Sequence, residues 1–156
     1  MNASILRFLS AVAIIAVTFP TSADANAPAG QYVVTADGTG NGTVYDTKSK
    51  LTWQQTVSST TYGWADAKTY CAGVGASLGG TGWRLPTIKE LVTIVDLSQA
   101  TAPMIDVNAF PGTPANWFWS SSWGADYSSA AWLVHFGSGV ASFFAASYMC
   151  NVRCVR

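Results

Sequence analysis

The spacing of apolar residues predicts two helices in the middle of the chain. Between Trp64 and Ala72, apolar side chains recur three and four positions apart, which places them on one face of a helix. The string at residues 87–90, Thr-Ile-Lys-Glu, is a capping box, in which the Thr and Glu side chains bond to free amides at a helix start. The helix that follows carries an apolar stripe of the same period, made of Ile88, Leu91, Ile94 and Val95.

Short segments rich in β-forming residues predict strands on both sides of these helices. Residues 32–34 favour one strand, and residues 43–46 and 51–54 favour the two arms of a hairpin. After Ala100 the helical period disappears, and four more strands are predicted, at residues 117–121, 131–136, 140–144 and 151–155. Helices followed by a late run of strands indicate the α+β class, with no repeat or linker that would divide the chain.

The first 25 residues predict a secretory signal peptide. Arg7 supplies a positive charge, residues 8–19 are almost entirely apolar, and the segment ends in the Ala-x-Ala cleavage pattern of residues 23–25. The apolar run is shorter than the roughly 20 residues that a membrane-spanning helix needs. Cleavage after Ala25 leaves a short lead at residues 26–37 and one domain at 38–156. We expect that domain to be secreted, periplasmic or displayed at the cell surface.

The composition narrows the possible function classes. The chain of 156 residues has eight Lys and Arg, eight Asp and Glu, and a charged fraction of 10%, whereas an average soluble chain carries about 25%. Without an excess of basic residues, nucleic acid is not an expected partner. Seven Trp, six Tyr and seven Phe residues are typical of a folded domain and not of a disordered one.

Residues that usually carry catalysis or bind metals are sparse. His135 is the single histidine. Strand alternation sends it and Leu133 toward solvent, opposite a buried face made of Trp132, Val134 and Phe136. The acids are dispersed and the cysteines lack metal-ligand spacing, so no metal or other cofactor is expected. Residues 75–79 match a nucleophile-elbow string but lie outside the strand-to-helix context of that motif, and we expect a turn there.

The three cysteines permit one disulfide and leave one thiol over. An exported chain is expected to oxidise the pair, and Cys71 has two possible partners, Cys150 and Cys154. Either bridge ties the middle of the chain to its last predicted strand. The alternative is a redox pair formed by Cys150 and Cys154, with Arg153 beside it to favour a thiolate.

Several motifs follow one another along the chain in a specific order. They are Thr43-Val44-Tyr45-Asp46, Leu51-Thr52-Trp53-Gln54, Trp64 with Ala67 and Tyr70-Cys71, Gly82-Trp83-Arg84-Leu85-Pro86-Thr87 with Glu90-Leu91, Trp119-Ser120-Ser121-Ser122, Ala131-Trp132 with Phe136 and Gly139, and Val152-Arg153-Cys154-Val155-Arg156. With these motifs the chain resembles the Legionella collagen-like protein C-terminal domain family, a set of exported bacterial domains, over residues 38–156.

The resemblance implies a C-type-lectin-like fold, related to the formylglycine-generating enzymes, in which two helices pack on a twisted antiparallel sheet. It also implies a disulfide from the first helix to the last strand, between Cys71 and Cys154. The family's named member is an adhesin that binds sulfated polysaccharide. Sulfate recognition needs clustered Arg or Lys, and none lies between Lys89 and Arg153, so we do not carry this ligand over.

The stretch between Asp126 and Tyr148 has an unusual composition. Apart from Trp132, it holds residues encoded by codons that end in cytosine, and it lacks Lys, Glu, Gln and Met. Family members often carry Asn there, and retroelements that diversify bacterial lectin-fold proteins rewrite Asn codons. Under this hypothesis the display positions are Leu133, His135, Ser138, Ala141–Ser147 and Cys150. The alternative is a β surface of small residues.

Together these features predict an exported, non-enzymatic binding or adhesion module that meets an unknown protein or carbohydrate through its C-terminal strands and loops. The candidate ligand-binding residues are Tyr127, Leu133, His135, Ser138, Phe143, Phe144 and Tyr148. Two explanations, a stacking platform for sugars or a part of the core, apply to Trp117, Phe118, Trp119 and Trp123. The alternative functions are an enzyme of the formylglycine-generating kind with a C-terminal thiol pair, and a structural component of the cell envelope.

Overall fold

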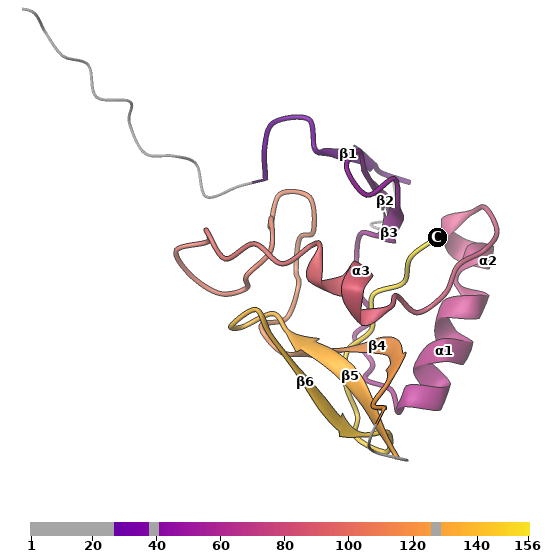
Figure 1. Cartoon of the computed structure of the whole chain (residues 1–156). Helices are drawn as coiled ribbons and strands as arrows, with labels where there is room; N and C mark the ends of the chain where they lie inside the picture. The colour runs from indigo at the N-terminus through magenta and orange to yellow at the C-terminus, as the bar shows by residue number, and fades with distance from the viewer. Residues whose placement is uncertain (1–26, 38–40, 126–128) are drawn as a thin grey trace, which may run out of the picture.

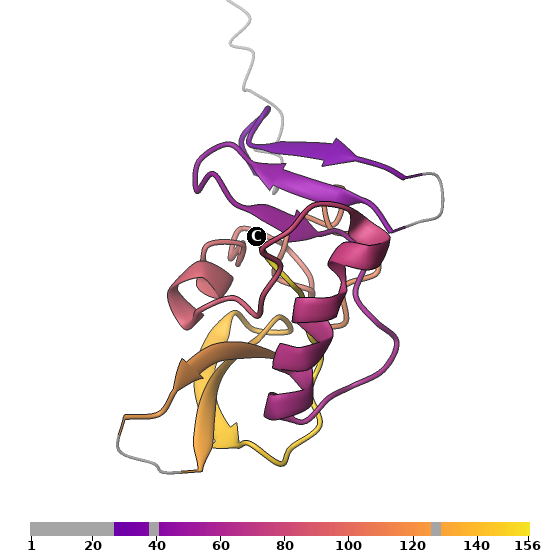
Figure 2. The same ribbon diagram turned by 90° about the vertical axis from the view of Figure 1, so that its right-hand side faces the viewer.

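Three helices and two antiparallel sheets make up the structure, a computed structural model that describes residues 27–37, 41–125 and 129–156 (Figure 1). The α+β class is confirmed. The expectation of one sheet is wrong, because the strands form two separate sheets of three. Figure 2 shows these sheets at opposite ends of the molecule, with the helices between them. The predicted signal peptide lies outside the described residues.

The first sheet contains the early strands that the sequence predicts. Its strands run in the order β1 (Tyr32–Thr35), β2 (Thr43–Asp46) and β3 (Thr52–Gln54). Val44 stands at the centre, paired with Val34 on one side and Trp53 on the other. Val44 and Trp53 are fully buried, so the inner face of this sheet belongs to the core.

The helices follow the predicted pattern with two exceptions: a short helix replaces the turn expected at residues 75–79, and the second predicted helix ends at Val92, so Ile94 and Val95 of its apolar stripe lie beyond it. They are α1 (Trp64–Gly73), α2 (Gly75–Leu78) and α3 (Ile88–Val92). The capping box is confirmed: the Glu90 amide donates to Thr87 Oγ1 at 3.2 Å, and the Thr87 amide donates to Glu90 Oε2 at 2.8 Å. The turn expected at residues 75–79 is wrong, because the Leu78 amide still bonds to the Val74 carbonyl and forms the short helix α2.

The second sheet contains the late strands. They run in the order β4 (Trp117–Trp123), β5 (Ala130–His135) and β6 (Val140–Ala145). Helix α1 packs against β4, whereas α3 packs against β4 and β5. A register shift between Trp119 and Trp123 interrupts the pairing of β4 with β5.

Both faces of β5 are buried at its centre, which overturns the predicted alternation. Val134 and Phe136 belong to a cluster with Leu91 of α3, whereas Leu133 belongs to a cluster with Cys71 of α1. Leu133, expected to face solvent, is therefore fully buried. Alternation tells two faces apart, but it fails for a strand that is covered on both.

The C-terminal segment, residues 150–156, lies between the two sheets and is not the regular strand that was predicted. It makes isolated bridges, from Cys150 to Tyr62, from Asn151 to Phe118, and from Val155 to both Trp53 and Arg84. The segment thus bonds to four parts of the chain in turn, and this sharing prevents a continuous ladder with any one of them.

A disulfide fixes this segment to α1. It joins Cys71 to Cys154, with 5.3 Å between the Cα atoms. Both cysteines are fully buried, and Cys150 is the free cysteine. The pairing implied by the resemblance is confirmed.

The neighbouring Arg153 fixes the segment on its other side. Its fully buried guanidinium donates from Nη1 to the Gln54 and Gln55 carbonyls at 2.8 and 2.6 Å. From Nη2 it donates to the Thr113 hydroxyl at 2.7 Å, and it lies 4.6 Å from the ring centre of Phe110. Burial lowers the pKa of Arg153 to about 9, so the group keeps its charge at neutral pH.

Removal of the disulfide should destabilise the domain strongly. The bridge joins residues 83 positions apart, and for such a loop the chain-entropy model gives roughly 4 to 5 kcal/mol. We expect Cys71→Ser to lower the free energy of unfolding by this amount in urea denaturation. Cys150→Ser is the control for loss of a buried sulfur, and it should lower the free energy of unfolding by a smaller amount. Equal losses in the two variants would contradict the cross-linking role.

Candidate functional site

Four aromatic side chains form a continuous, partly exposed row on the second sheet. The ring centre of Trp117 lies 4.7 Å from that of His135 and 4.8 Å from that of Phe144. Phe144 lies 5.3 Å from Tyr148, which is 59% exposed. We call Trp117, His135, Phe144 and Tyr148 the aromatic row.

Strand register places three members of the row, Trp117, His135 and Phe144, on one face of the sheet. Trp117 of β4 stands opposite His135 of β5, and Phe144 of β6 stands opposite Ala131. Opposite residues of an antiparallel pair project to the same face. Leu133 shares this face but is buried among side chains of α1, so the row continues the buried α1 cluster outward to the surface.

The stretch of chain that carries the row has no charge in its described part. Residues 107–125 and 129–152 contain no Lys, Arg, Asp or Glu. The flanking charged residues, Asp106 and Arg153, are both buried. The polar groups of the row lie at its His135 end, where a hydrogen bond of 3.0 Å joins His135 Nδ1 and Ser138 Oγ. A charged ligand would therefore find no ionic partner on these strands.

The rings of the row are tilted against one another. The interplanar angle is 49° between Trp117 and His135, 60° between Trp117 and Phe144, and 44° between Phe144 and Tyr148. Tilted and edge-on contacts are the arrangement that packed aromatic side chains prefer. The row is a corrugated surface and does not offer one flat stacking plane.

Four of the predicted site residues come together here: His135, Ser138, Phe144 and Tyr148. The prediction that Leu133 contacts a ligand is wrong, because this side chain is fully buried. Tyr127 lies outside the described residues. Cys150, one of the display positions, is also buried.

Phe143 does not join the row, because it projects to the opposite face of the sheet. It is paired with Trp132, whose ring lies 5.5 Å away. Trp132 itself is partly exposed, which corrects the prediction that it lies in the core. Phe143 is 36% exposed, so the second face also ends in aromatic side chains at the surface.

Trp117 is the member of the row whose role the sequence leaves open. Of the four aromatic residues weighed as a platform, Phe118 and Trp119 are fully buried. Trp123 packs against Trp64 at the start of α1, 4.6 Å between ring centres. Aromatic content alone does not separate these roles, because strand register and helix position decide which rings stay at the surface.

The described residues show no candidate metal centre at the row. They contain no group of three His, Cys, Asp or Glu side chains that could hold a metal ion. Cys154 is in the disulfide, and burial raises the pKa of the Cys150 thiol to about 11. No described helix has the length and apolarity to cross a membrane.

The comparison with protein families gives one match. A family model described as the Lcl C-terminal domain matches residues 42–156, from just before β2 to the last residue. Strand β1 lies outside this match. No curated protein matches the chain. The family match confirms the resemblance drawn from the motifs, and the chain belongs to the Lcl C-terminal domain family.

Proposed function

We propose that this protein is an exported, non-enzymatic binding module whose ligand contacts the aromatic row. The observation that carries the proposal is a set of partly exposed rings on strands that have no charged side chain. The cores of protein interfaces are enriched in aromatic residues and depleted of charged ones. Membership in the Lcl C-terminal domain family supports a role in surface binding.

A protein ligand fits this surface better than a carbohydrate. A sugar ring stacks best on one flat aromatic face, whereas the rings here are tilted by 44° to 60°. A corrugated row accepts side chains between its rings, and the absence of charge favours a neutral, apolar patch on the partner. Carbohydrate binding is the second candidate, because His135 and Ser138 supply hydrogen-bonding groups beside the rings.

Export and a C-type-lectin-like fold are parts of the same proposal. The disulfide is compatible with an oxidising compartment outside the cytoplasm. The arrangement of α1 and α3 on an antiparallel sheet, with a bridge from α1 to the C-terminal segment, supports the relation to lectin-like domains. Secretion, the periplasm and the cell surface are all compatible with these features.

Retroelement diversification, where it occurs, would act on a smaller set of positions than the sequence suggests. Ser138, Ala141, Ala145 and Ser147 are exposed. Leu133 and Cys150 are buried, so free variation at these two positions would disturb the α1 cluster. The variable set proposed here therefore omits these two positions and keeps His135, Ser138 and Ala141–Ser147.

Binding should depend on the row and not on exposed apolar residues elsewhere. We expect the domain to bind members of a protein array in preference to a glycan array. Tyr148→Ala should weaken that binding about tenfold or more, because exposed aromatic anchors dominate interface energies. Ser138→Glu should weaken it by placing a charge beside His135. Val33→Ala, at a 50% exposed residue of β1, is the control. No binding on either array, or loss of binding in the control alone, would contradict the proposal.

The diversification proposal is checked by sequencing the genomic locus. We expect a reverse transcriptase gene and a template repeat whose adenines align with the codons for His135, Ser138 and Ala141–Ser147. A locus without these two elements would reject diversification and leave the binding proposal intact.

The thiol-enzyme alternative makes a different prediction about the cysteines. With Cys154 in the disulfide and the pKa of Cys150 near 11, an aromatic disulfide reagent at pH 8 should react with no thiol in the folded protein. In denaturant it should react with one. Two thiols that react in the folded, non-reduced protein would favour the enzyme over the binding module.

A further inference from the structure

A pocket of about 360 Å³ lies where α1, the segment before α3 and the later part of β4 meet. It is lined by Lys68, Ala72, Trp83, Arg84, Leu85 and Ser121. Pockets that hold small ligands measure about 300 to 1,000 Å³, so this volume suits a small molecule. Ser121 follows Trp117 by four residues, which is roughly 13 Å along β4. The pocket, which we call the Trp83 pocket, is therefore separate from the aromatic row.

Apolar side chains make up most of the pocket wall. Trp83 and Leu85 are 5% and 2% exposed, and both belong to the buried α1 cluster. The Trp83 indole is fixed by a hydrogen bond of 2.8 Å, which its Nε1 donates to the Gly79 carbonyl. Ala72 leaves space on α1, because its side chain is a single methyl group. These three side chains offer a compact apolar body a surface to pack against.

Hydrogen bonds and a disulfide hold the walls of the pocket together. The Arg84 backbone exchanges two hydrogen bonds of 2.9 Å with Val155. The Ser121 amide donates to the Pro86 carbonyl at 2.6 Å, which joins β4 to the segment before α3. Helix α1 is tied to the C-terminal segment through the disulfide of Cys71. Because the walls are already fixed, a ligand loses little free energy in ordering them.

Lys68 gives the pocket a positive charge that no carboxylate of the described residues pairs with. The side chain is exposed, and its Nζ lies 4.5 Å from the ring centre of Trp64. The ion pair found among the described residues joins Arg84 to Glu90 and leaves Lys68 without one. Asp66, the acid of α1, precedes Lys68 by two residues and thus points about 200° away around the helix. Lys68 is therefore available to an anion in the pocket.

Arg84 is oriented by Glu90 and still has donors to spare. Its Nη1 and Nη2 donate to the two Glu90 oxygens at 2.8 and 2.7 Å, and its side chain is 46% exposed. Hydrogen bonds from Arg84 lower the pKa of Glu90 to about 2, so this pair stays charged at neutral pH. A guanidinium has more N–H donors than these two. The fixed fork can therefore donate to a second carboxylate that enters the pocket.

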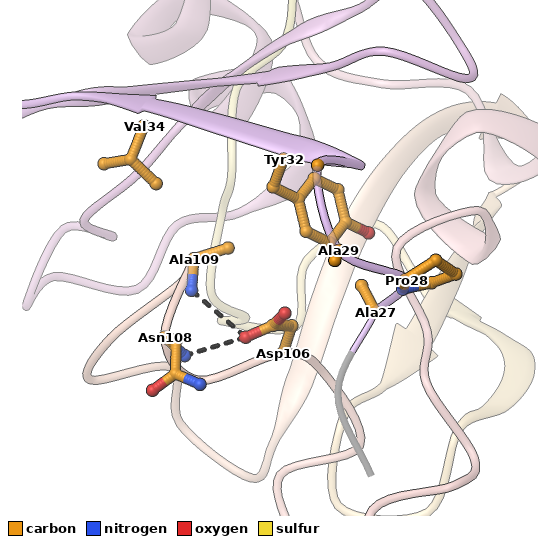
Figure 3. A pocket seen from close by; sticks show the side chains of 9 residues that line it. Ala27, Pro28, Ala29, Tyr32, Val34, Asp106, Asn108 and Ala109 are labelled. Carbon is orange, nitrogen blue, oxygen red and sulfur yellow. Dashed lines mark hydrogen bonds between the residues drawn. The ribbon is translucent and has the colours of Figure 1, made fainter. Parts of the chain in front are cut away.

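The two pockets beside β1 differ from the Trp83 pocket in charge. Figure 3 shows the first, in which the Asp106 carboxylate accepts hydrogen bonds from two loop amides. The second is lined by Lys48, but Asp96 lines it as well. Of these three pockets, the Trp83 pocket is the one lined by cations and by no carboxylate of the described residues. An anionic ligand therefore fits there and not beside β1.

We propose that the Trp83 pocket binds a small organic acid, whose carboxylate contacts Lys68 and Arg84 while its apolar body packs on the Trp83 indole. The two cations determine the sign of the ligand, because charge-assisted hydrogen bonds to a carboxylate are stronger than neutral ones. The apolar walls and the volume of about 360 Å³ limit the body to one ring or a short alkyl chain. The site adds a small-molecule ligand to the protein partner proposed for the aromatic row, and it does not depend on that partner.

The test uses hydrocinnamate, a phenyl ring joined to a carboxylate by a short chain. In an NMR titration of the ¹⁵N-labelled protein, the Trp83 indole N–H signal should shift and saturate with a Kd of about 1 mM, the range open to a ligand of this size. The Trp117 indole, in the aromatic row, should not shift. The amide of hydrocinnamate has the same shape without the charge, and acetate has the charge without the ring. Both should bind at least about tenfold more weakly.

Substitution of Lys68 tests the charge. Lys68→Gln keeps a polar side chain and should weaken the binding of hydrocinnamate about tenfold, because a charge-assisted contact is lost. Lys48→Gln is the matched control, since it removes an exposed cation from a pocket beside β1 and should leave the Kd unchanged. Both lysines are exposed, so both variants should keep the Tm of the parent chain.

A second pair of variants tests the space in the pocket. Ala72→Leu adds atoms to the wall beside Trp83 and should abolish binding, whereas Leu is nearly as favourable in a helix as Ala. Ala65→Leu adds the same atoms at an exposed position of α1 that does not line the pocket. This control should bind hydrocinnamate as the parent chain does.

Saturable binding that is weakened in Lys68→Gln and lost in Ala72→Leu supports the proposal. Absence of a Trp83 shift at concentrations well above the expected Kd overturns it, as do equal affinities for the acid and its amide. Equal affinities of Lys68→Gln and Lys48→Gln overturn it too. A shift of the Trp117 indole alone places the acid on the aromatic row and rejects the Trp83 pocket. The array experiment on the aromatic row is independent of these results.

Discussion

The placement of the C-terminal segment between the two sheets is the constraint on which the rest of the structure depends. Residues 150–156 exchange backbone hydrogen bonds with Tyr62, Trp117, Thr52 and Arg84, which belong to four separate parts of the chain. None of these contacts is a long ladder. The segment is held by two neighbouring side chains, since Cys154 is bonded covalently to α1 and the Arg153 guanidinium binds the carbonyls after β3.

This constraint also supports the aromatic row. The Asn151 amide and side chain both donate to the Trp117 carbonyl, at 2.9 and 3.1 Å, and the Asn151 carbonyl accepts from the Trp119 amide. The C-terminal segment therefore occupies the outer edge of β4, while β5 occupies the other edge. The row stands on a strand that is fixed from both sides, and a rigid support lowers the entropy lost when a ligand binds.

Charge is distributed unevenly over the molecule. The strands with the row carry none in their described part, whereas Asp46, Asp96 and Asp106 gather around Tyr32 beside the first sheet. A neutral surface limits ionic attraction and leaves shape and apolar contact to determine the partner.

The sequence by itself determined the α+β class, the strands at 43–46 and 51–54, the capping box at Thr87 and Glu90, and the neutral character of the C-terminal region. These are local properties, set by periodicity, propensity and composition. Tertiary structure decided that Leu133 is buried, because α1 covers a face that alternation assigned to solvent. It also decided that Trp117 and not Trp119 reaches the surface, and that residues 150–156 pair with several neighbours and not with one. Contacts between residues far apart in sequence set these outcomes, and no local pattern encodes them.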